Sequence, residues 1–315
     1  MNMEATGSLI TVNFDGKPLE KLIEVVSNGI GTLYRPRKIR KEAEAQAYAI
    51  KLIENAKAVA GSESMLIETE TLERIGQRLV AQEIRRQNNI DGVVEKAAED
   101  LKGKDVSEEP VSEDWSTRFF GIVQDVSQEE MKALWAKILA REIERPTSFS
   151  MRTLETLRNL SAKEAELFEK IAPFILQHGN YFIYNESEVL EKFGIHYIDL
   201  AQLTECGLLQ PGTFVRNTYE SKPDEDMKSA IVYGKYVIIM ILPKMTKSVN
   251  IPVTLLTQTG IELFGLLEPE ENLDYVKAIA GNIKKRNTEA QLQYAEIISI
   301  DEEKGIEYRT PVTDL

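Results

Sequence analysis

The hydrophobic pattern changes its period near residue 179, and this change constrains the fold more than any other feature of the sequence. Before it, apolar residues recur every three or four positions, as in amphipathic helices. After it, short apolar runs such as 181–184 and 236–242 alternate with short helical patterns that end at glycines. The pattern predicts a mainly α protein with a C-terminal α+β domain.

Residues 1–101 are expected to form an elongated N-terminal helical region, after a short strand at 11–14. Leu19, Leu22 and Val26 lie on one stripe of a first helix. Further helical patterns cover about 37–60, 65–87 and 90–101, so we expect a long helical hairpin or bundle. Residues 102–113 are polar and acidic and contain Gly and Pro, which is typical of a linker.

Residues 114–178 are expected to form a compact helical domain, in which residues 115–126 and 131–139 each present one apolar helical face. Ser127 with Glu130, and Ser161 with Glu164, have the spacing of capping boxes, in which each side chain satisfies a free backbone N–H group. The second box is expected to open a helix that runs to a C-terminal cap at Gly179. His178 would then lie at the helix end, where the dipole favours a cation.

Residues 179–315 have the order of a winged-helix-like domain. A strand at 181–184, helices at 186–193 and 197–206, a polar loop at 217–230 and a strand at 231–242, either straight or bent at Gly234, are predicted. A strand at 252–256, helices at 257–267 and 273–285, and a strand at 290–299 complete the pattern.

Composition excludes several kinds of chemistry. The chain of 315 residues has one Cys and two His, so we expect neither a disulfide nor a zinc site, and no metal or cofactor is predicted. The segment Gly29-Ile-Gly31 follows a helical pattern and lacks the third glycine of a dinucleotide loop, which favours a plain turn. No catalytic constellation is recognisable, so the protein is not expected to be an enzyme.

The charge balance argues against a broad nucleic-acid surface. Asp and Glu total 51 against 38 Lys and Arg, giving a net charge of −13, whereas phosphate binding depends on cations. No signal-peptide pattern and no apolar run long enough to cross a membrane occurs, so a cytoplasmic location is expected.

One basic segment leaves two interpretations open. It contains the five cations Arg35, Arg37, Lys38, Arg40 and Lys41. They could bind phosphates or another anionic surface. Alternatively they form a solvated helix start, in which the cations pair with glutamates four residues later.

The second winged-helix helix, 197–206, is the element that would enter a DNA groove. If Ile198, Leu203 and either Leu200 or Ala201 face inward, the candidate contact residues Asp199, Gln202 and Glu205 face outward. Carboxylates without Lys or Arg would repel phosphates, so the pattern favours contact with a protein, with nucleic acid as the alternative.

The turn around Pro146 offers a second candidate contact. Arg145 could hydrogen-bond the carbonyls that are free at the preceding helix end. Alternatively the polar turn, with Phe149 exposed at its tip, contacts a partner.

Residues 134–160 read LWAKILAREIERPTSFSMRTLETLRNL. This block resembles an uncharacterised bacterial family, domain of unknown function 2806, and the segments GKPLEKLI and GTLYRP near the N-terminus are compatible with that family. Residues 114–178 are also similar to abortive-infection alpha proteins, which are linked to phage defence. The resemblance implies a bacterial origin and a connection with phage defence, and it supplies no catalytic residues.

Together these observations favour a non-enzymatic protein-interaction or scaffold component, of an abortive-infection-like phage-defence system. A protein partner or homo-oligomer is expected, with contacts through helices in 65–101 and through the winged-helix face. The alternative is a nucleic-acid-binding regulator that uses the 35–41 basic segment and the winged helix.

Overall fold

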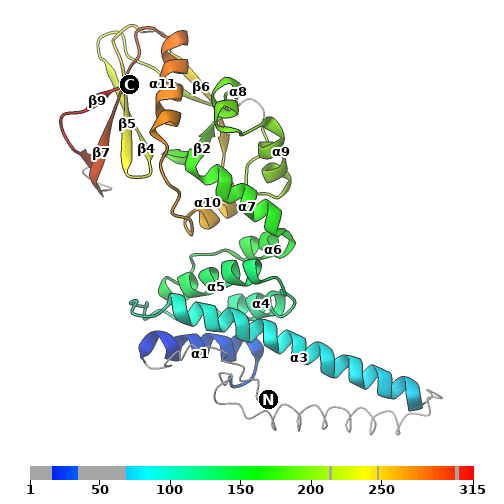
Figure 1. Cartoon of the computed structure of the whole chain (residues 1–315). Coiled ribbons are helices and arrows are strands. Elements are labelled where there is room, and N and C mark those ends of the chain that lie inside the picture. Colours follow the sequence, from blue (N-terminus) through cyan, green and yellow to red (C-terminus); the bar gives the residue numbers. More distant parts are fainter. Residues whose placement is uncertain (1–15, 35–68, 213–214, 247, 302–304) are drawn as a thin grey trace, which may run out of the picture. The chain divides into compact units, whose positions relative to one another are not determined.

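The computed structural model describes residues 16–34, 69–212, 215–246, 248–301 and 305–315 (Figure 1). The predicted strand at 11–14 and helix at 37–60 lie outside these residues. The chain divides into two compact units, Met1–Leu154 and Glu155–Leu315, and each is described separately.

The first unit is helical in its described residues. Its helices are α1 (Lys17–Ile30), α3 (Thr69–Asp100), α4 (Glu113–Val123), α5 (Glu129–Glu144) and the start of α6 (Met151–Asn159). Helix α1 packs against α4, and α3 packs against α5. The helical patterns predicted at 65–87 and 90–101 belong to one continuous helix of 32 residues. In Figure 1 the first half of α3 extends beyond α1, α4 and α5.

An aromatic cluster lies in the core of this unit. The Trp115 and Phe119 rings stack with their centroids 4.9 Å apart, and Trp135 meets Phe119 edge-on at 5.4 Å. Such offset and edge-on pairs add to the stabilisation gained by burial. The predicted apolar faces of the helices at 115–123 and 131–139 are therefore confirmed.

Gly29 and Gly31 serve the packing and the end of α1. A Cβ on Gly29 would lie 2.3 Å from Phe120 Cδ2 and 2.7 Å from the Ser116 carbonyl oxygen, so glycine allows α1 and α4 to approach closely. Gly31 has φ 71° and forms the C-cap of α1. The pair therefore marks a helix end, as expected, and not a phosphate-binding loop.

One of the two predicted capping boxes forms. The box at Ser127 is wrong, because α5 begins at Glu129 and Gln128 is its N-cap. The second is confirmed at the start of α7 (Ala162–Ile171): Glu164 Oε2 accepts from the Ser161 N–H at 2.7 Å, and Ser161 Oγ accepts from the Glu164 N–H at 3.3 Å.

The end predicted for that helix is also wrong. Helix α7 stops at Ile171, and a 3-10 turn, η1 (Ala172–Phe174), contains Pro173, whose ring cannot continue a helix interior. Strand β1 (Ile175–His178) follows, so His178 ends a strand and not a helix. Gly179, with φ 69°, turns the chain into β2 (Asn180–Tyr184).

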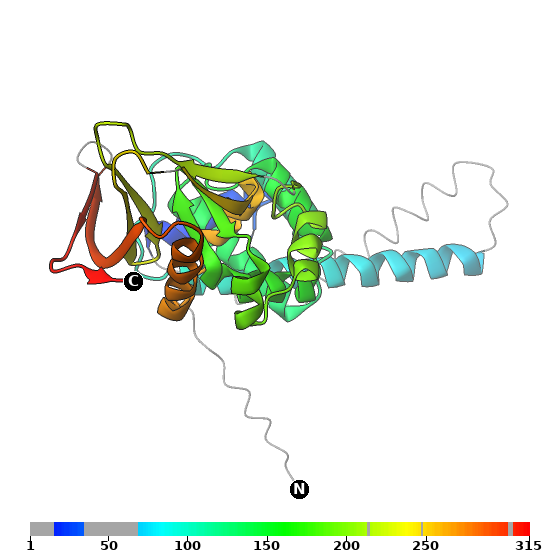
Figure 2. The ribbon, with the colours of Figure 1, turned by 90° about the horizontal axis from the view of Figure 1, so that it is seen from above.

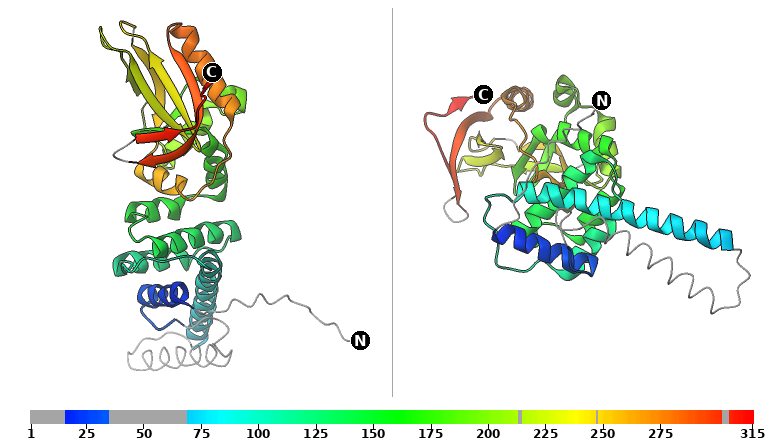
Figure 3. Two further views of the ribbon diagram at one scale, coloured as in Figure 1. Left: turned by 90° about the vertical axis from the view of Figure 1, so that its left-hand side faces the viewer. Right: turned by 60° about the horizontal axis from the view of Figure 1, so that its bottom comes forward.

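The second unit contains a nine-stranded sheet whose strand pairs, within the described residues, are antiparallel (Figures 1 and 3). The strands that follow β2 are β3 (Arg216–Tyr219), β4 (Met227–Tyr233), β5 (Tyr236–Leu242), β6 (Val249–Leu255), β7 (Gln291–Asp301), β8 (Gly305–Tyr308) and β9 (Thr313–Asp314). Their order in the sheet is β3-β6-β2-β1-β4-β5-β7-β8, and β9 pairs with β7.

Helices α8 (Ser187–Leu190), α9 (Tyr197–Glu205), α10 (Gln258–Phe264) and α11 (Leu273–Arg286), with the 3-10 turn η2 (Glu191–Phe193), complete this unit. Tyr275 of α11 is fully buried. Its hydroxyl accepts from the Tyr184 N–H of β2 at 3.3 Å and donates to the Phe174 carbonyl at 3.2 Å. The tyrosine thus fixes α11 to the backbone of the sheet.

The strand pattern departs from the prediction at two places. The predicted loop at 217–230 contains most of β3 and the start of β4. The predicted single strand at 231–242 is a hairpin of β4 and β5, because Gly234 with φ 52° reverses the chain. The mainly helical fold with a C-terminal α+β part is confirmed, and the winged-helix assignment stays a prediction.

Candidate protein-contact surface

Helix α9 is held by a short loop before it and by two leucines beneath it. Gly194 has φ 69°, a left-handed conformation that glycine adopts without strain, and it ends the preceding helical turn. Leu200 and Leu203 are buried against the rest of the unit. Asp199 Oδ2 accepts from the His196 N–H at 2.9 Å, which satisfies a backbone donor that the helix start would leave free.

Helix α9 exposes a different side from the one predicted from the sequence. Ile198 was expected to face inward, but its side chain is 68% exposed, and its neighbour Tyr197 is 75% exposed. Asp199 was expected to face outward, but it is half-buried at the helix start, with Lys170 Nζ 3.8 Å from its carboxylate. The expectation is wrong for both residues because Leu200, at about 200° from Ile198 around the helix, sets the buried side.

The exposed side of α9 consists of Tyr197, Ile198, Gln202 and Glu205, and we call it the α9 outer face. Gln202 and Glu205 are exposed, as expected. Helix α9 contains no Lys or Arg, and neighbouring Lys170 donates to the Gly194 carbonyl at 2.8 Å. An apolar pair beside a carboxylate suits a protein surface better than a phosphate backbone.

The turn after α5 is closed, which corrects the expectation that Phe149 is exposed. Phe149 is 3% exposed, and its carbonyl accepts from Trp115 Nε1 at 2.9 Å. The Glu142 carboxylate, itself 2% exposed, accepts from the backbone N–H groups of Thr147 at 2.7 Å and Phe149 at 3.0 Å. Phe149 is therefore a core residue of the first unit.

Glu142 is the residue of this turn that sequence reasoning missed. The signal was present, because this acidic residue lies on the otherwise apolar side of α5 beside Leu139 and Ile143. A carboxylate there needs hydrogen-bond donors, and the following turn supplies them. Arg145 is exposed, and its carbonyl accepts from Ser148 Oγ at 2.6 Å, so its role in contact with a partner stays a prediction.

Two further groups of predicted contact residues have different outcomes. The cations of the basic segment, Arg35, Arg37, Lys38, Arg40 and Lys41, lie outside the described residues, so their role stays a prediction. On α3, where contact with another helix was predicted, the apolar side chains of Ile75, Leu79 and Ile84 are 37%, 47% and 51% exposed. They are accessible to a partner, and their role in contact stays a prediction.

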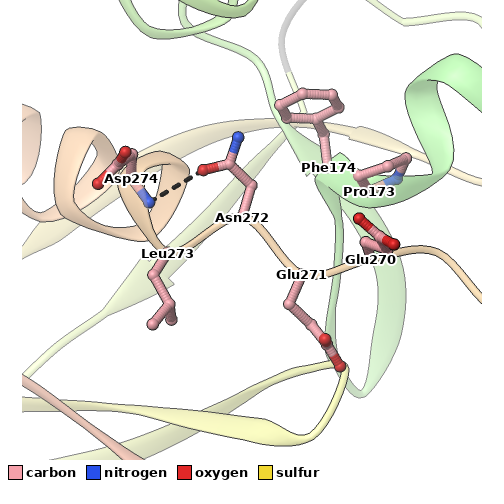
Figure 4. Close-up of a pocket in the computed structure, with 7 residues that line it drawn as sticks. All are labelled: Pro173, Phe174, Glu270, Glu271, Asn272, Leu273 and Asp274. Atoms are coloured by element: carbon pink, nitrogen blue, oxygen red, sulfur yellow. Dashed lines mark hydrogen bonds between the residues drawn. The ribbon is translucent and has the colours of Figure 1, made fainter.

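A recess of about 420 Å³ lies at the start of α11 (Figure 4). Pro173, Phe174, Glu270, Glu271, Asn272, Leu273 and Asp274 line it. Asn272 Oδ1 accepts from the Asp274 and Tyr275 N–H groups at 3.0 and 3.3 Å, which caps the helix. Glu271 Oε1 accepts from the Lys235 N–H at 3.0 Å. These polar groups hold the helix start and the β4–β5 turn.

His178 lies between two hydroxyl groups at the end of β1. Its Nε2 is 3.0 Å from Ser229 Oγ of β4, and its Nδ1 is 3.5 Å from the Tyr219 hydroxyl of β3. Burial lowers the pKa of His178 and raises the pKa of Tyr219 to about 12, so both are neutral near pH 7. A serine and an imidazole at this distance could serve nucleophilic catalysis, but the recess of Figure 4 lies elsewhere, and the contacts link three strands.

Cys206 follows α9 and is not a reactive thiol in this structure. Burial, together with Glu164 nearby, raises the pKa of its thiol to about 12, whereas a nucleophilic cysteine requires a lowered pKa. Among the residues that the structure describes, no group of three or more His, Cys, Asp or Glu side chains is placed to hold a metal ion. Within the same residues, no helix has the length and apolar character needed to span a membrane.

Comparison with known proteins gives one match. Neither the curated proteins nor the solved structures yield a match to the chain. The family model described as a protein of unknown function, DUF2806, matches residues 73–280. This match covers most of α3, the helices up to α10, six strands and the first half of α11, so the chain belongs to the DUF2806 family.

Proposed function

We propose that this protein is a non-enzymatic interaction component that binds a partner protein through the α9 outer face. The observation that carries the proposal is the exposure of Tyr197 and Ile198, 75% and 68%, side by side on a helix without a cation. Aromatic side chains that become buried at an interface contribute a large share of binding energy.

The partner that fits this surface has an apolar recess for Tyr197 and Ile198 and a Lys or Arg opposite Glu205. Removing the two apolar side chains from water contributes about 2–4 kcal/mol before the costs of association. Because α9 is anchored by Leu200, Leu203 and the Asp199 cap, binding requires little ordering of its backbone.

The winged-helix assignment and the link to phage defence are part of the same proposal. Helices α8 and α9 come between β2 and β3 in the chain, and β6 lies between β3 and β2 in the sheet. This arrangement supports a winged-helix role for α9, used here for a protein and not for DNA. Membership of an abortive-infection-like phage-defence system stays a proposal that rests on the similarity of residues 114–178.

The test compares complexes of the full chain purified gently from its native host cells. We expect the wild-type protein to elute in a protein-only complex heavier than 35.6 kDa, and the double variant Tyr197→Ser with Ile198→Ser to elute without the partner. Met245→Ser is the matched control, because Met245 is 80% exposed and lies in the same unit.

Retention of the partner by the double variant, or its loss from the Met245→Ser control as well, would contradict the proposal. A wild-type protein that elutes at its monomer mass with no other component would contradict it too. Circular dichroism of each variant shows whether the fold is retained, so loss of binding is distinguished from unfolding.

A further inference from the structure

Three arginines lie on one side of the first half of α3. Arg74, Arg78 and Arg85 are four and seven residues apart and all are exposed. With about 100° of rotation per residue, the three lie within about 40° around the helix axis, and with about 1.5 Å of rise they span about 16 Å. We call them the α3 arginine stripe. Figures 2 and 3 show that this half of α3 extends away from the other described helices of its unit.

The stripe has few internal partners. Among the described residues, neither Arg78 nor Arg85 has an ion pair or hydrogen bond, and Arg74 contacts Thr71 Oγ1 at 3.3 Å. The neighbouring Arg86 differs, because it forms ion pairs with Glu83 at 2.9 Å and Asp125 at 3.2 Å. The guanidinium groups of the stripe are therefore available to an external ligand.

From Arg74 to Asn88, the side of α3 that carries the stripe holds no acidic residue. Gln77, Ala81 and Asn88 flank the arginines there, and none of these side chains is charged. Glu83 is nine residues from Arg74, which places it on the opposite side of the helix. Glu70, one turn before Arg74, is the nearest acidic residue on the same side, so the positive charge of the stripe is concentrated toward Arg78 and Arg85.

We propose that the α3 arginine stripe binds the phosphate backbone of double-stranded nucleic acid. Guanidinium groups bind phosphate oxygens through planar, paired hydrogen bonds. A duplex carries one negative charge per about 1.7 Å of its axis when both strands are counted, so about 16 Å of duplex holds about nine phosphates, enough for each of the three arginines to contact one. Contacts of this kind fix the position of a protein on a duplex without reading its sequence.

This site is independent of the α9 outer face. The stripe belongs to the first unit and the α9 outer face to the second. The stripe is proposed to bind an anionic phosphate backbone, whereas the α9 outer face is proposed to bind a protein with an apolar recess and a cation. Failure of one proposal therefore leaves the other intact.

The test measures binding of the full-length protein to a fluorescein-labelled DNA duplex of mixed sequence by fluorescence anisotropy. Three phosphate contacts predict that Kd rises about 40-fold between 50 and 200 mM salt. Changing Arg74, Arg78 and Arg85 together to Gln should abolish this salt-dependent binding.

A matched control removes the same charge elsewhere. Lys163, Lys192 and Lys285 are exposed and lie in the second unit, and changing them to Gln should leave the affinity within about twofold. Equal loss in this control would show that net charge and not the stripe is responsible, which overturns the proposal.

Three other results would overturn it. The wild-type protein could fail to bind the duplex at 50 mM salt. Binding could persist in the stripe variant and vanish when Arg37, Lys38, Arg40 and Lys41 are changed to Gln, which would assign it to the basic segment. Finally, the stripe could bind a poly-glutamate peptide more tightly than the duplex, which would indicate an acidic protein ligand.

Discussion

The turn after α5 and the start of α9 each place an aromatic residue at a helix boundary, but the two residues differ in burial. Phe149 lies in the turn before α6, and Tyr197 is the first residue of α9. Phe149 is 3% exposed and Tyr197 is 75% exposed. The difference follows from what lies beneath each boundary.

Beneath the turn, Glu142 offers two buried carboxylate oxygens, and the backbone N–H groups of Thr147 and Phe149 turn inward to reach them. Beneath α9, the Asp199 carboxylate satisfies the His196 N–H within the same helix start, so no group draws Tyr197 or Ile198 inward. The buried Glu142 carboxylate therefore holds the turn of Phe149 against the core. The Asp199 cap is local to the start of α9, and Tyr197 stays exposed to solvent.

The largest expected effect is on the closed turn. Changing Phe149 to Ala should lower the free energy of unfolding by about 4 kcal/mol, because it leaves a cavity where a buried ring was. Both tryptophans of the chain, Trp115 and Trp135, lie in the first unit, so tryptophan fluorescence during urea unfolding reports on this unit. Phe149→Leu is the control, with a loss of about 1 kcal/mol. A loss below 1 kcal/mol for Phe149→Ala would mean that the side chain is not in the core.

Glu142→Ala should follow, with a loss of about 3 kcal/mol, because the buried Phe149 N–H and the partly buried Thr147 N–H lose their acceptor. The same fluorescence measurement applies. Glu144→Ala is the comparison, since Glu144 forms ion pairs with Lys104 and Arg141, whose side chains are partly exposed, and a loss of at most 1 kcal/mol is expected. Equal losses in the two variants would show that the Glu142 carboxylate does not hold the turn.

Asp199→Ala should have a smaller effect, about 1 kcal/mol, because the helix start remains accessible to water and the His196 N–H can find a solvent partner. Thermal unfolding followed by circular dichroism measures the change. Asp199→Asn, which keeps an acceptor oxygen, should recover most of the loss. No difference between the Ala and Asn variants would show that the cap does not determine how α9 begins.

The smallest effect on stability is expected for the α9 outer face. Tyr197→Ser with Ile198→Ser should change the free energy of unfolding by less than about 0.5 kcal/mol, because both side chains are already in water. The same variant should lose the partner protein in the co-purification described above. A large loss of stability would show that the pair packs inside the fold and would remove the basis for a contact role.

Sequence periodicity predicted most of the helices, because burial on one side of a helix leaves a repeat of three to four residues. The faces of α1, α4 and α5 and the capping box at Ser161 are confirmed for this reason. A bend at Gly234 was one expectation, but the full reversal that makes the β4–β5 hairpin was missed, because a positive φ cannot be deduced from the apolar run that contains this glycine. Strands β8 and β9 were missed because their residues are mostly polar or exposed.

The candidate sites were predicted in part. The lack of cations on α9 and the exposure of Gln202 and Glu205 follow from composition and spacing. The outward position of Ile198 does not follow from them. One orientation of this nine-residue helix buries Ile198 with Leu203 and another buries Leu200 with Leu203, and the spacing does not choose between the two. The α3 arginine stripe was readable at helical spacing, but which arginines of α3 form ion pairs with described residues depends on where Glu83 and Asp125 lie.

The sequence by itself determined the class of the fold, the positions of most helices, the family and the unusual scarcity of Cys and His. These depend on local propensity, on the hydrophobic period and on counts of residues. All three can be read from the sequence without knowing which segments meet in space. Tertiary structure decided which aromatic residue is buried, which way α9 faces and which arginines are paired. Those outcomes depend on long-range partners such as Glu142 for the turn and Asp125 for Arg86, and sequence spacing does not encode distances between segments far apart in the chain.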